Sequence, residues 1–290
     1  MKAIYIIITM LAAALTASCA GKGNPDDTPD GEIWVHSKPL VAKVEVSSEG
    51  TLVETFEYTY DDKGRMLTLK KTDNLSRNVL LEMQYSYPGE NEMKVQGKFY
   101  PIATNRFITV TYDPKAGVLG STGSWNGAWS YTTAINGDGV ATETLCKEQF
   151  ASKEGYYTSD MVYSETYTVS GGTIAESVCG TDIKARSSKA TGSDNTSALR
   201  TVYAVSDKAD KQNFAAYLMP ANFPVWIAAG LPGNKNLVKG ITSFTGGVQT
   251  AVSTAIEYSF NADGSIDTAT RTDSNAGVPY LSRTYKFIYQ

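Results

Sequence analysis

The chain contains 290 residues, of which 42% are hydrophobic, and its formal net charge at pH 7 is −4. This composition suits one large all-β domain or two small domains. Lysine and arginine residues are scattered along the chain, which argues against a nucleic acid partner, because neutralising phosphate groups requires concentrated positive charge.

The N-terminus has the pattern of an export signal. A lysine precedes an apolar run at residues 3–17, which is too short for a membrane-spanning helix. The run leads into residues 15–19 (LTASC), which resemble the lipobox of bacterial lipoproteins, with the leucine one position farther from the cysteine than usual. We predict a lipoprotein signal peptide at residues 1–18 and acylation of Cys19. A plain secretory signal cleaved near the same cysteine is the alternative.

A polar segment follows the signal. Residues 19–32 comprise the predicted lipidated cysteine and a stretch rich in glycine, proline and aspartate, a composition typical of a flexible tether. Its acidic residues resemble the stretch that sends some Bacteroides-type lipoproteins to the cell surface. The sequence therefore predicts an outer-membrane protein held by its lipid anchor and facing the periplasm or the cell surface.

The remainder, residues 33–290, reads as a single antiparallel β domain. The stretch from residue 56 to 73 is echoed from residue 256 to 273, at a constant offset of 200. In both stretches aromatic or aliphatic residues alternate with polar ones, and a turn ending in glycine (Gly64 and Gly264) follows. We predict two matching hairpins near the two edges of one sheet, in a meander that curls into a barrel-like or half-barrel shape.

Two segments interrupt this alternation. Residues 187–198 are rich in serine and glycine and are predicted to form a polar loop. Residues 212–230 form the most apolar stretch after the signal, broken by two prolines. The second segment is predicted to be a short helical or irregular insert that covers one opening or face of the sheet.

These features resemble a Bacteroides-type lipoprotein family of unknown function that is described as having a porin-like fold. The resemblance is carried by the Tyr-x-aromatic-Asp-x-x-Gly-Arg stretch at residues 58–65, the Gly-Asn-Lys-Asn-Leu stretch at residues 233–237, and the echo at residues 258–264. It implies a curled β-meander and no catalytic residues.

Enzyme chemistry finds little support in the sequence. His36 is the only histidine and is predicted to lie on the surface of a flexible segment, so sites that need an imidazole base or ligand are disfavoured. The acidic residues cluster at turns without EF-hand spacing, and no cofactor or metal is expected. A carboxylate-dependent hydrolase such as a glycosidase remains the alternative function.

The two cysteines of the β domain, Cys146 and Cys179, flank the strand predicted at residues 156–169. Strands on either side of a common neighbour lie roughly 9–10 Å apart. A disulfide bond requires Cα atoms within about 7 Å. A disulfide bond between these cysteines is therefore not expected.

Residues 124–131 (SWNGAWSY) are the best candidate for ligand stacking. Asn-Gly is a strong two-residue hairpin signal, which would place Ser124 opposite Trp129. In that register Trp129 and Tyr131 share one face, and Trp125 lies on the other. Exposed members of this group could stack on a sugar ring, whereas ordinary hairpin packing is the alternative.

An integral outer-membrane barrel is the remaining structural alternative. Such a barrel needs an apolar outer face on every strand. The outward positions here include the charged residues Glu57, Lys70, Glu143, Lys147, Glu257 and Lys286. The sequence therefore favours a non-enzymatic binding or scaffolding protein of the cell envelope, with a glycan or another envelope protein as its partner.

Overall fold

The computed structural model describes residues 34–36, 38–100, 104–113, 115–124, 127–135, 141–151, 157–187, 191–195, 199–210 and 235–290. The predicted signal peptide, tether and apolar insert lie outside these ranges. The described part contains 17 strands in one sheet. They are β1 (Val41–Ser48), β2 (Thr51–Tyr60), β3 (Met66–Asp73), β4 (Asn78–Gly89), β5 (Glu92–Phe99), β6 (Thr104–Asp113), β7 (Val118–Ser124), β8 (Gly127–Ile135), β9 (Ala141–Ala151), β10 (Tyr157–Ser170), β11 (Thr173–Ser187), β12 (Thr191–Asn195), β13 (Leu199–Ala209), β14 (Asn236–Thr245), β15 (Val248–Phe260), β16 (Ile266–Asn275) and β17 (Val278–Tyr289).

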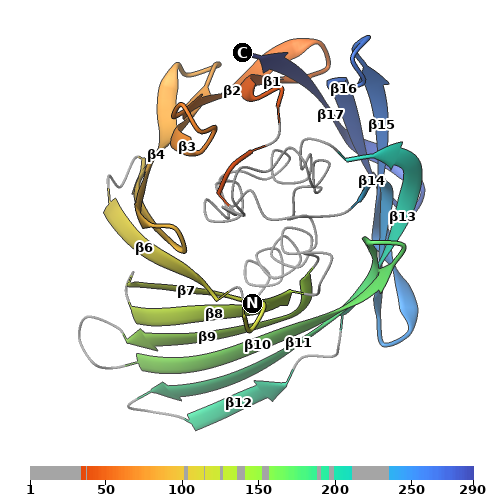
Figure 1. The fold of residues 1–290 in the computed structure, drawn as a ribbon. Coiled ribbons are helices and arrows are strands. Elements are labelled where there is room, and N and C mark those ends of the chain that lie inside the picture. Colours follow the sequence, from red (N-terminus) through yellow and green to blue (C-terminus); the bar gives the residue numbers. More distant parts are fainter. Residues whose placement is uncertain are drawn as a thin grey trace.

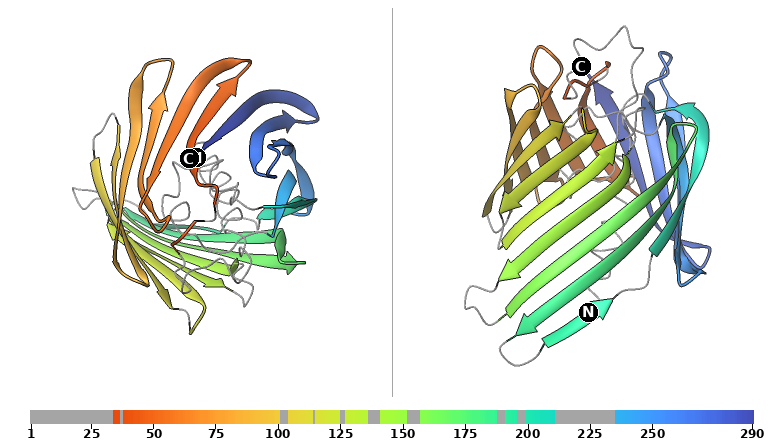
Figure 2. Two further views of the ribbon diagram at one scale, coloured as in Figure 1. Left: turned by 45° about the horizontal axis from the view of Figure 1, so that its top comes forward. Right: turned by 60° about the horizontal axis from the view of Figure 1, so that its bottom comes forward.

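The strands form an antiparallel meander that curls on itself (Figures 1 and 2). Strands next to each other in the chain pair with each other, and β11 pairs with both β12 and β13. The first strand, β1, pairs with β2 on one side and with the last strand, β17, on the other. The all-β, barrel-like meander predicted from the sequence is therefore confirmed, and the two echoing hairpins lie on either side of the β17–β1 pair.

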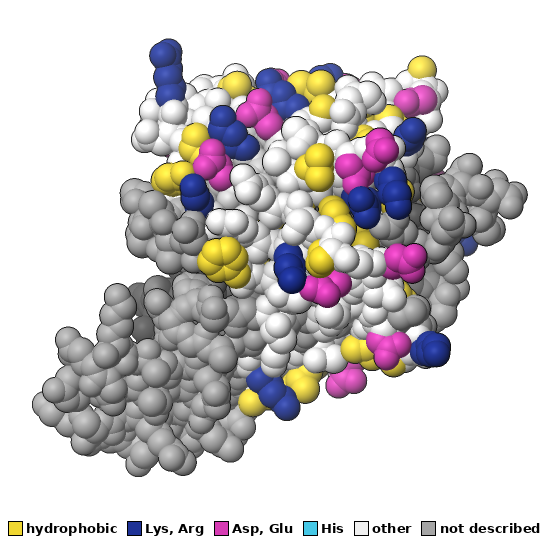
Figure 3. Space-filling view, turned by 60° about the vertical axis from the view of Figure 1, so that its left-hand side comes forward, with side chains coloured by type: hydrophobic (Ala, Val, Ile, Leu, Met, Phe, Trp, Pro, Cys, Tyr) yellow, Lys and Arg dark blue, Asp and Glu magenta, His cyan; other side chains and the backbone are white. Residues whose placement is uncertain are grey.

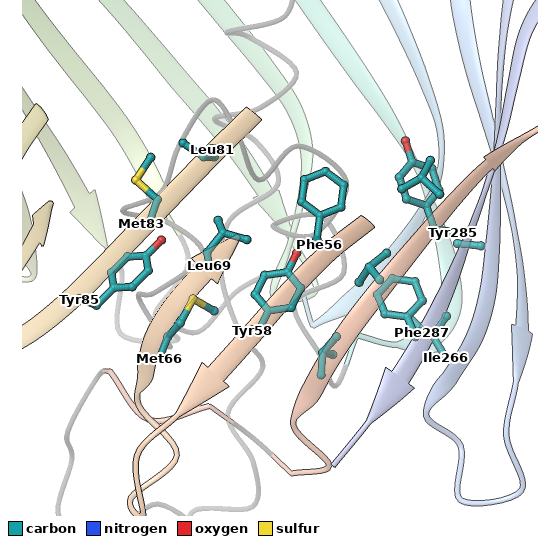
Figure 4. Packing of buried hydrophobic residues seen from close by; sticks show 14 of the residues in the cluster. Phe56, Tyr58, Met66, Leu69, Leu81, Met83, Tyr85, Ile266, Tyr285 and Phe287 are labelled. Atoms are coloured by element: carbon teal, nitrogen blue, oxygen red, sulfur yellow. The ribbon is translucent and has the colours of Figure 1, made fainter. Parts of the chain in front are cut away.

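The core lies on one face of this curled sheet. A single curled sheet shelters only its concave face, and the alternating pattern places large apolar side chains there. Figure 4 shows part of this cluster, drawn from β2, β3, β4, β16 and β17. The cluster includes Phe56, Tyr58, Met66, Leu69, Leu81, Met83, Tyr85, Ile266, Tyr285 and Phe287.

The echoed sequences form hairpins with the same geometry. Gly64 and Gly264 both adopt positive φ angles, 86° and 82°, which residues with a Cβ rarely adopt. The hydroxyl groups of Thr59 and Thr68 lie 2.6 Å apart on the first hairpin. Each hairpin also has a register shift just before its turn, after residue 59 in β2 and after residue 259 in β15. The offset of 200 in sequence thus corresponds to a structural repeat.

A tyrosine hydroxyl binds the second strand of each hairpin at the same place. Tyr87 donates a hydrogen bond to the carbonyl oxygen of Met66, at 2.7 Å. Tyr289 donates to the carbonyl oxygen of Ile266, also at 2.7 Å. Met66 and Ile266 are equivalent positions, each the first residue of its strand. A shifted register leaves backbone groups without a partner in the ladder, and a side-chain donor can supply one.

Asp61 organises the first turn through its carboxylate. One oxygen accepts hydrogen bonds from the backbone N–H groups of Lys63 and Arg65, at 3.1 and 2.9 Å, and the other accepts one from Arg65 Nε, at 2.7 Å. Burial raises the pKa of this carboxyl, but the hydrogen bonds and charge of Arg65 outweigh that effect, so the pKa lies below its ordinary value of 3.8. The equivalent residue of the second turn is Asn261.

We expect Asp61→Asn to make the free energy of unfolding less sensitive to acid pH. A carboxyl whose pKa is lowered on folding contributes stability above its unfolded pKa, and this contribution is lost as pH falls through the folded pKa. The free energy of unfolding of the parent should therefore decline below pH 3.8, and the variant should lack part of that decline. Urea unfolding between pH 2 and pH 7 measures this, and identical pH profiles for the two proteins would contradict it.

The N-terminal residues of the described part pack into the domain. Trp34 is fully buried, and its indole N–H donates a 2.7 Å hydrogen bond to the carbonyl oxygen of Glu90. His36 is 8% exposed, and its backbone N–H donates to the carbonyl oxygen of Gly64. The prediction of a surface His36 in a flexible segment is wrong, because this segment pairs with the β2–β3 turn (Val35 with Arg65).

Other expectations have mixed outcomes. The loop predicted at residues 187–198 contains β12, which pairs with the end of β11, so that prediction is partly wrong. A short polar segment without apolar alternation can still form a strand by adding to a sheet edge, because backbone groups supply the pairing. Strand β10 lies between the strands that carry Cys146 and Cys179, as predicted. None of the described residues forms a helix with the length and hydrophobicity that a bilayer crossing requires.

Candidate ligand-binding site

The predicted aromatic site falls on the β7–β8 hairpin. Ser124 pairs with Ala128, and Gly123 pairs with Trp129. The predicted register, with Ser124 opposite Trp129, is wrong by one residue. Trp125 lies outside the described residues, as do the side chains of Trp129 and Tyr131, so sugar stacking there stays a prediction.

A different group of polar side chains lies on the core face of the sheet. We call it the charged row: Glu54, Lys71, Arg271, Asp273 and Arg283. Each member alternates in phase with buried core residues of its own strand, as Arg283 does with Tyr285 and Phe287. The same alternation that directs aromatic residues into the core therefore directs these charges to the concave face.

The charged row is held together by one ion pair between β2 and β3 and one within β16. Lys71 Nζ lies 2.8 Å from a carboxylate oxygen of Glu54, and Arg271 Nε lies 3.0 Å from Asp273 Oδ1. The same Asp273 oxygen accepts a 2.6 Å hydrogen bond from the hydroxyl of Thr254. Lys71 also lies 5.1 Å from the centre of the Phe56 ring, a cation–π distance. Both carboxylates of the row are therefore engaged by cations.

The two arginines of the row are directly opposed. Arg271 on β16 and Arg283 on β17 are register partners, so their side chains leave the sheet side by side. Arg283 reaches across β1 toward Glu54, but the shortest contact is 3.9 Å, which is too long for a hydrogen bond. Its Nε is shielded from solvent and has no hydrogen-bond acceptor among the described residues.

Four residues of the charged row act electrostatically on the buried phenol of Tyr285. Burial raises the pKa of its phenol above the ordinary value of 10.0. Arg271 and Arg283 oppose that increase, whereas Glu54 and Asp273 add to it. All four charged groups are thus close enough to act on one phenol. Three cations and two carboxylates give the row one excess positive charge, which suits an anionic ligand better than a metal ion. The described residues contain no group of acidic, histidine and cysteine side chains suited to a metal.

Sequence reasoning missed the charged row, although a signal was present. Charged residues that share the phase of the aromatic ladder, such as Glu54 with Phe56 and Tyr58, are predicted to face the core. The sequence interpretation considered only charged residues of the opposite phase. The six that it named are all exposed, as expected for the convex face: Glu57, Lys70, Glu143, Lys147, Glu257 and Lys286.

Similarity to known proteins is confined to solved structures. No family model matches the chain, and no curated protein matches it either. A porin-like protein from Bacteroides uniformis ATCC 8492 aligns with 89% of this chain and 100% of its own, at 13% identity and a TM-score of 0.49. A porin-like protein from Bacteroides vulgatus ATCC 8482 aligns with 87% of this chain and 98% of its own, at 12% identity and a TM-score of 0.56. The chain therefore shares the fold of this second porin-like protein, as the resemblance seen in its sequence implied.

Proposed function

We propose that this protein is a lipid-anchored, non-enzymatic binding protein of the bacterial cell envelope, and that the charged row is its binding surface. The observation that carries the proposal is the placement of five charged side chains on the concave face, beside the aromatic core. Acylation of Cys19 would hold the domain at the membrane surface, and the segment between Cys19 and Trp34 would act as its tether.

The free-energy cost of burying these charged side chains supports a functional role for them. Charges taken out of water lose solvation, and apolar residues of similar size in their place are often neutral or stabilising. The side chains of Lys71 and Asp273 are only 15% and 8% exposed. A sheet built for stability alone would continue the apolar pattern of Phe56 and Tyr58 through these positions. A ligand that contacts the charges supplies a reason for keeping them.

The convex face has the polar and charged side chains of a surface that is exposed to water. Hydroxyl groups lie in pairs across its strands, as Thr270 and Thr284 do at 3.2 Å. Charged side chains of both signs are scattered over the part of this surface seen in Figure 3. A lipid-facing wall would need an apolar surface instead. The lipid anchor is therefore the membrane attachment that we propose.

We expect Cys19→Ser to release the protein from membranes. The signal would still direct export, but without acyl chains the attachment energy of about 0.8 kcal/mol per buried methylene is lost. Fractionation of cells that make the full-length chain would show the parent in the membrane fraction and the variant in the soluble fraction. Ser18→Ala keeps the cysteine and serves as the control. A variant that still incorporates labelled fatty acid would contradict lipid anchoring at Cys19.

Ligand binding is tested with the full chain against neutral oligosaccharides, acidic oligosaccharides and short peptides. A ligand at a hundred times its Kd should raise the unfolding free energy by about 2.7 kcal/mol. The control replaces four row residues together, Glu54→Gln, Arg271→Gln, Asp273→Asn and Arg283→Gln, and should bind none of the probes. Equal binding by parent and control, or no binding by the parent, would contradict the proposal. Shortened sugars recovered after incubation would instead indicate the hydrolase.

A further inference from the structure

We propose that Arg271 and Arg283 together bind the carboxylate group of an acidic sugar. This inference rests on the proposed function and names the ligand class of the same surface. It follows from an electrostatic imbalance within the charged row, which a single bound anion would relieve.

The imbalance comes from the strand register. Directly opposed residues on one face have Cβ atoms about 4.5–5.5 Å apart, and like charges at that distance destabilise a sheet. Arg271 and Arg283 are such a pair. Asp273 neutralises Arg271 through a 3.0 Å contact, whereas Glu54 is already engaged by Lys71 and lies 3.9 Å from Arg283. Arg283 therefore has the weakest ion pairing of the three cations in the row.

Arg283 also has an unused donor. Its Nε is shielded from solvent without a hydrogen-bond acceptor in the described part of the chain. A buried donor left unsatisfied costs about 1–3 kcal/mol. The rest of the side chain is 38% exposed, so a ligand can approach it. The two terminal nitrogens of a guanidinium form a planar fork that matches the two oxygens of a carboxylate.

The surroundings favour a sugar over a peptide. Large apolar side chains beside the row are almost fully buried: Val46, Phe56 and Tyr285 are each less than 5% exposed. These described neighbours of the row therefore offer little apolar surface for the side-chain anchors that peptide ligands commonly use. The groups that are available, such as Glu54 and Lys71, accept from and donate to hydroxyl groups. One excess positive charge also matches a single carboxylate better than a doubly charged phosphate.

The test measures binding of a galacturonic acid trimer and a galactose trimer to the full chain by titration calorimetry at low salt. The acidic trimer should bind more tightly than the neutral one. Arg283→Gln should weaken its binding by about 10-fold to 100-fold, as expected for the loss of hydrogen bonds to a charged group. Lys286→Gln is the matched control, because Lys286 lies on the same strand but on the exposed face, paired with Asp267. It should bind as the parent does.

Thermal unfolding without ligand separates a binding role from a structural one. Arg283→Gln removes one of two opposed cations, so its midpoint should equal or exceed that of the parent. A lower midpoint with unchanged trimer binding would overturn the inference. Neutral trimer binding as tight as the acidic one would overturn it while leaving the proposed function intact. Tighter binding of a Gly-Ser-Gly peptide than of the acidic trimer would show that the site binds peptide carboxylates, and would overturn the inference. Failure of the parent to bind any probe would contradict both the inference and the proposed function.

Discussion

Leu69→Ala is expected to lower the free energy of unfolding by about 2–5 kcal/mol, the usual cost of removing a large buried aliphatic side chain. Leu69 is fully buried between β2 and β4, opposite Tyr58 and Met83. The surrounding sheet is hydrogen-bonded on both sides, so it cannot collapse into the cavity without breaking backbone hydrogen bonds. The effect should therefore lie in the upper part of this range.

The same strand provides the control. Leu67 lies at the register shift of β3 and is 38% exposed, so Leu67→Ala removes the same atoms from a half-solvated position. Its cost should be below about 1 kcal/mol. Urea unfolding followed by circular dichroism measures both variants. Similar losses for the two would mean that the two faces of β3 are not distinguished as described.

Trp34→Ala is the second substitution with a large expected effect, about 3–5 kcal/mol. The indole is fully buried, lies 6.2 Å from the ring of Tyr87, and donates to the carbonyl oxygen of Glu90. Its removal would loosen the first described residues from β4 and from the turn that follows β4. The residue stands at the start of the domain, where a terminal segment would ordinarily be expected to contribute little.

Trp34→Phe separates the ring from the hydrogen bond. Phenylalanine keeps most of the buried area but has no N–H group, so the carbonyl of Glu90 loses its donor, at a cost of about 1–3 kcal/mol. Arg65, whose guanidinium lies 4.7 Å from the Tyr87 ring, would keep its contact in this variant. Chemical unfolding measures the stability of the parent, Trp34→Phe and Trp34→Ala, which we expect to decrease in that order. Parental stability in Trp34→Ala would show that the segment is not part of the folded domain.

Much of the fold follows from local patterns. Alternation of Phe56, Tyr58 and Tyr60 determines which face of β2 is buried, because successive side chains in a strand point to opposite faces. The glycines at positions 64 and 264 determine where the chain turns, because few other residues adopt positive φ. These patterns predicted the meander, the matching hairpins and the placement of β10 between the two cysteine-bearing strands.

The failed predictions concern what a local pattern leaves open. The Asn-Gly signal leaves the register of β7 against β8 open, and pairing along both strands places Ala128, not Trp129, opposite Ser124. His36 is buried because its segment meets a turn more than twenty residues later in the chain, and no spacing near His36 indicates that contact.

By itself, the sequence determined the all-β class, the period of the strands, the positions of the main turns and the outward face of charged residues such as Glu57, Lys70 and Lys286. Only the tertiary structure decided which charges meet. Glu54 and Arg283 approach each other across β1, and Arg271 and Arg283 are opposed because β16 and β17 pair in one register. Alternation is a property of one strand and can be read locally, whereas a binding surface depends on neighbours brought together when the first strand pairs with the last.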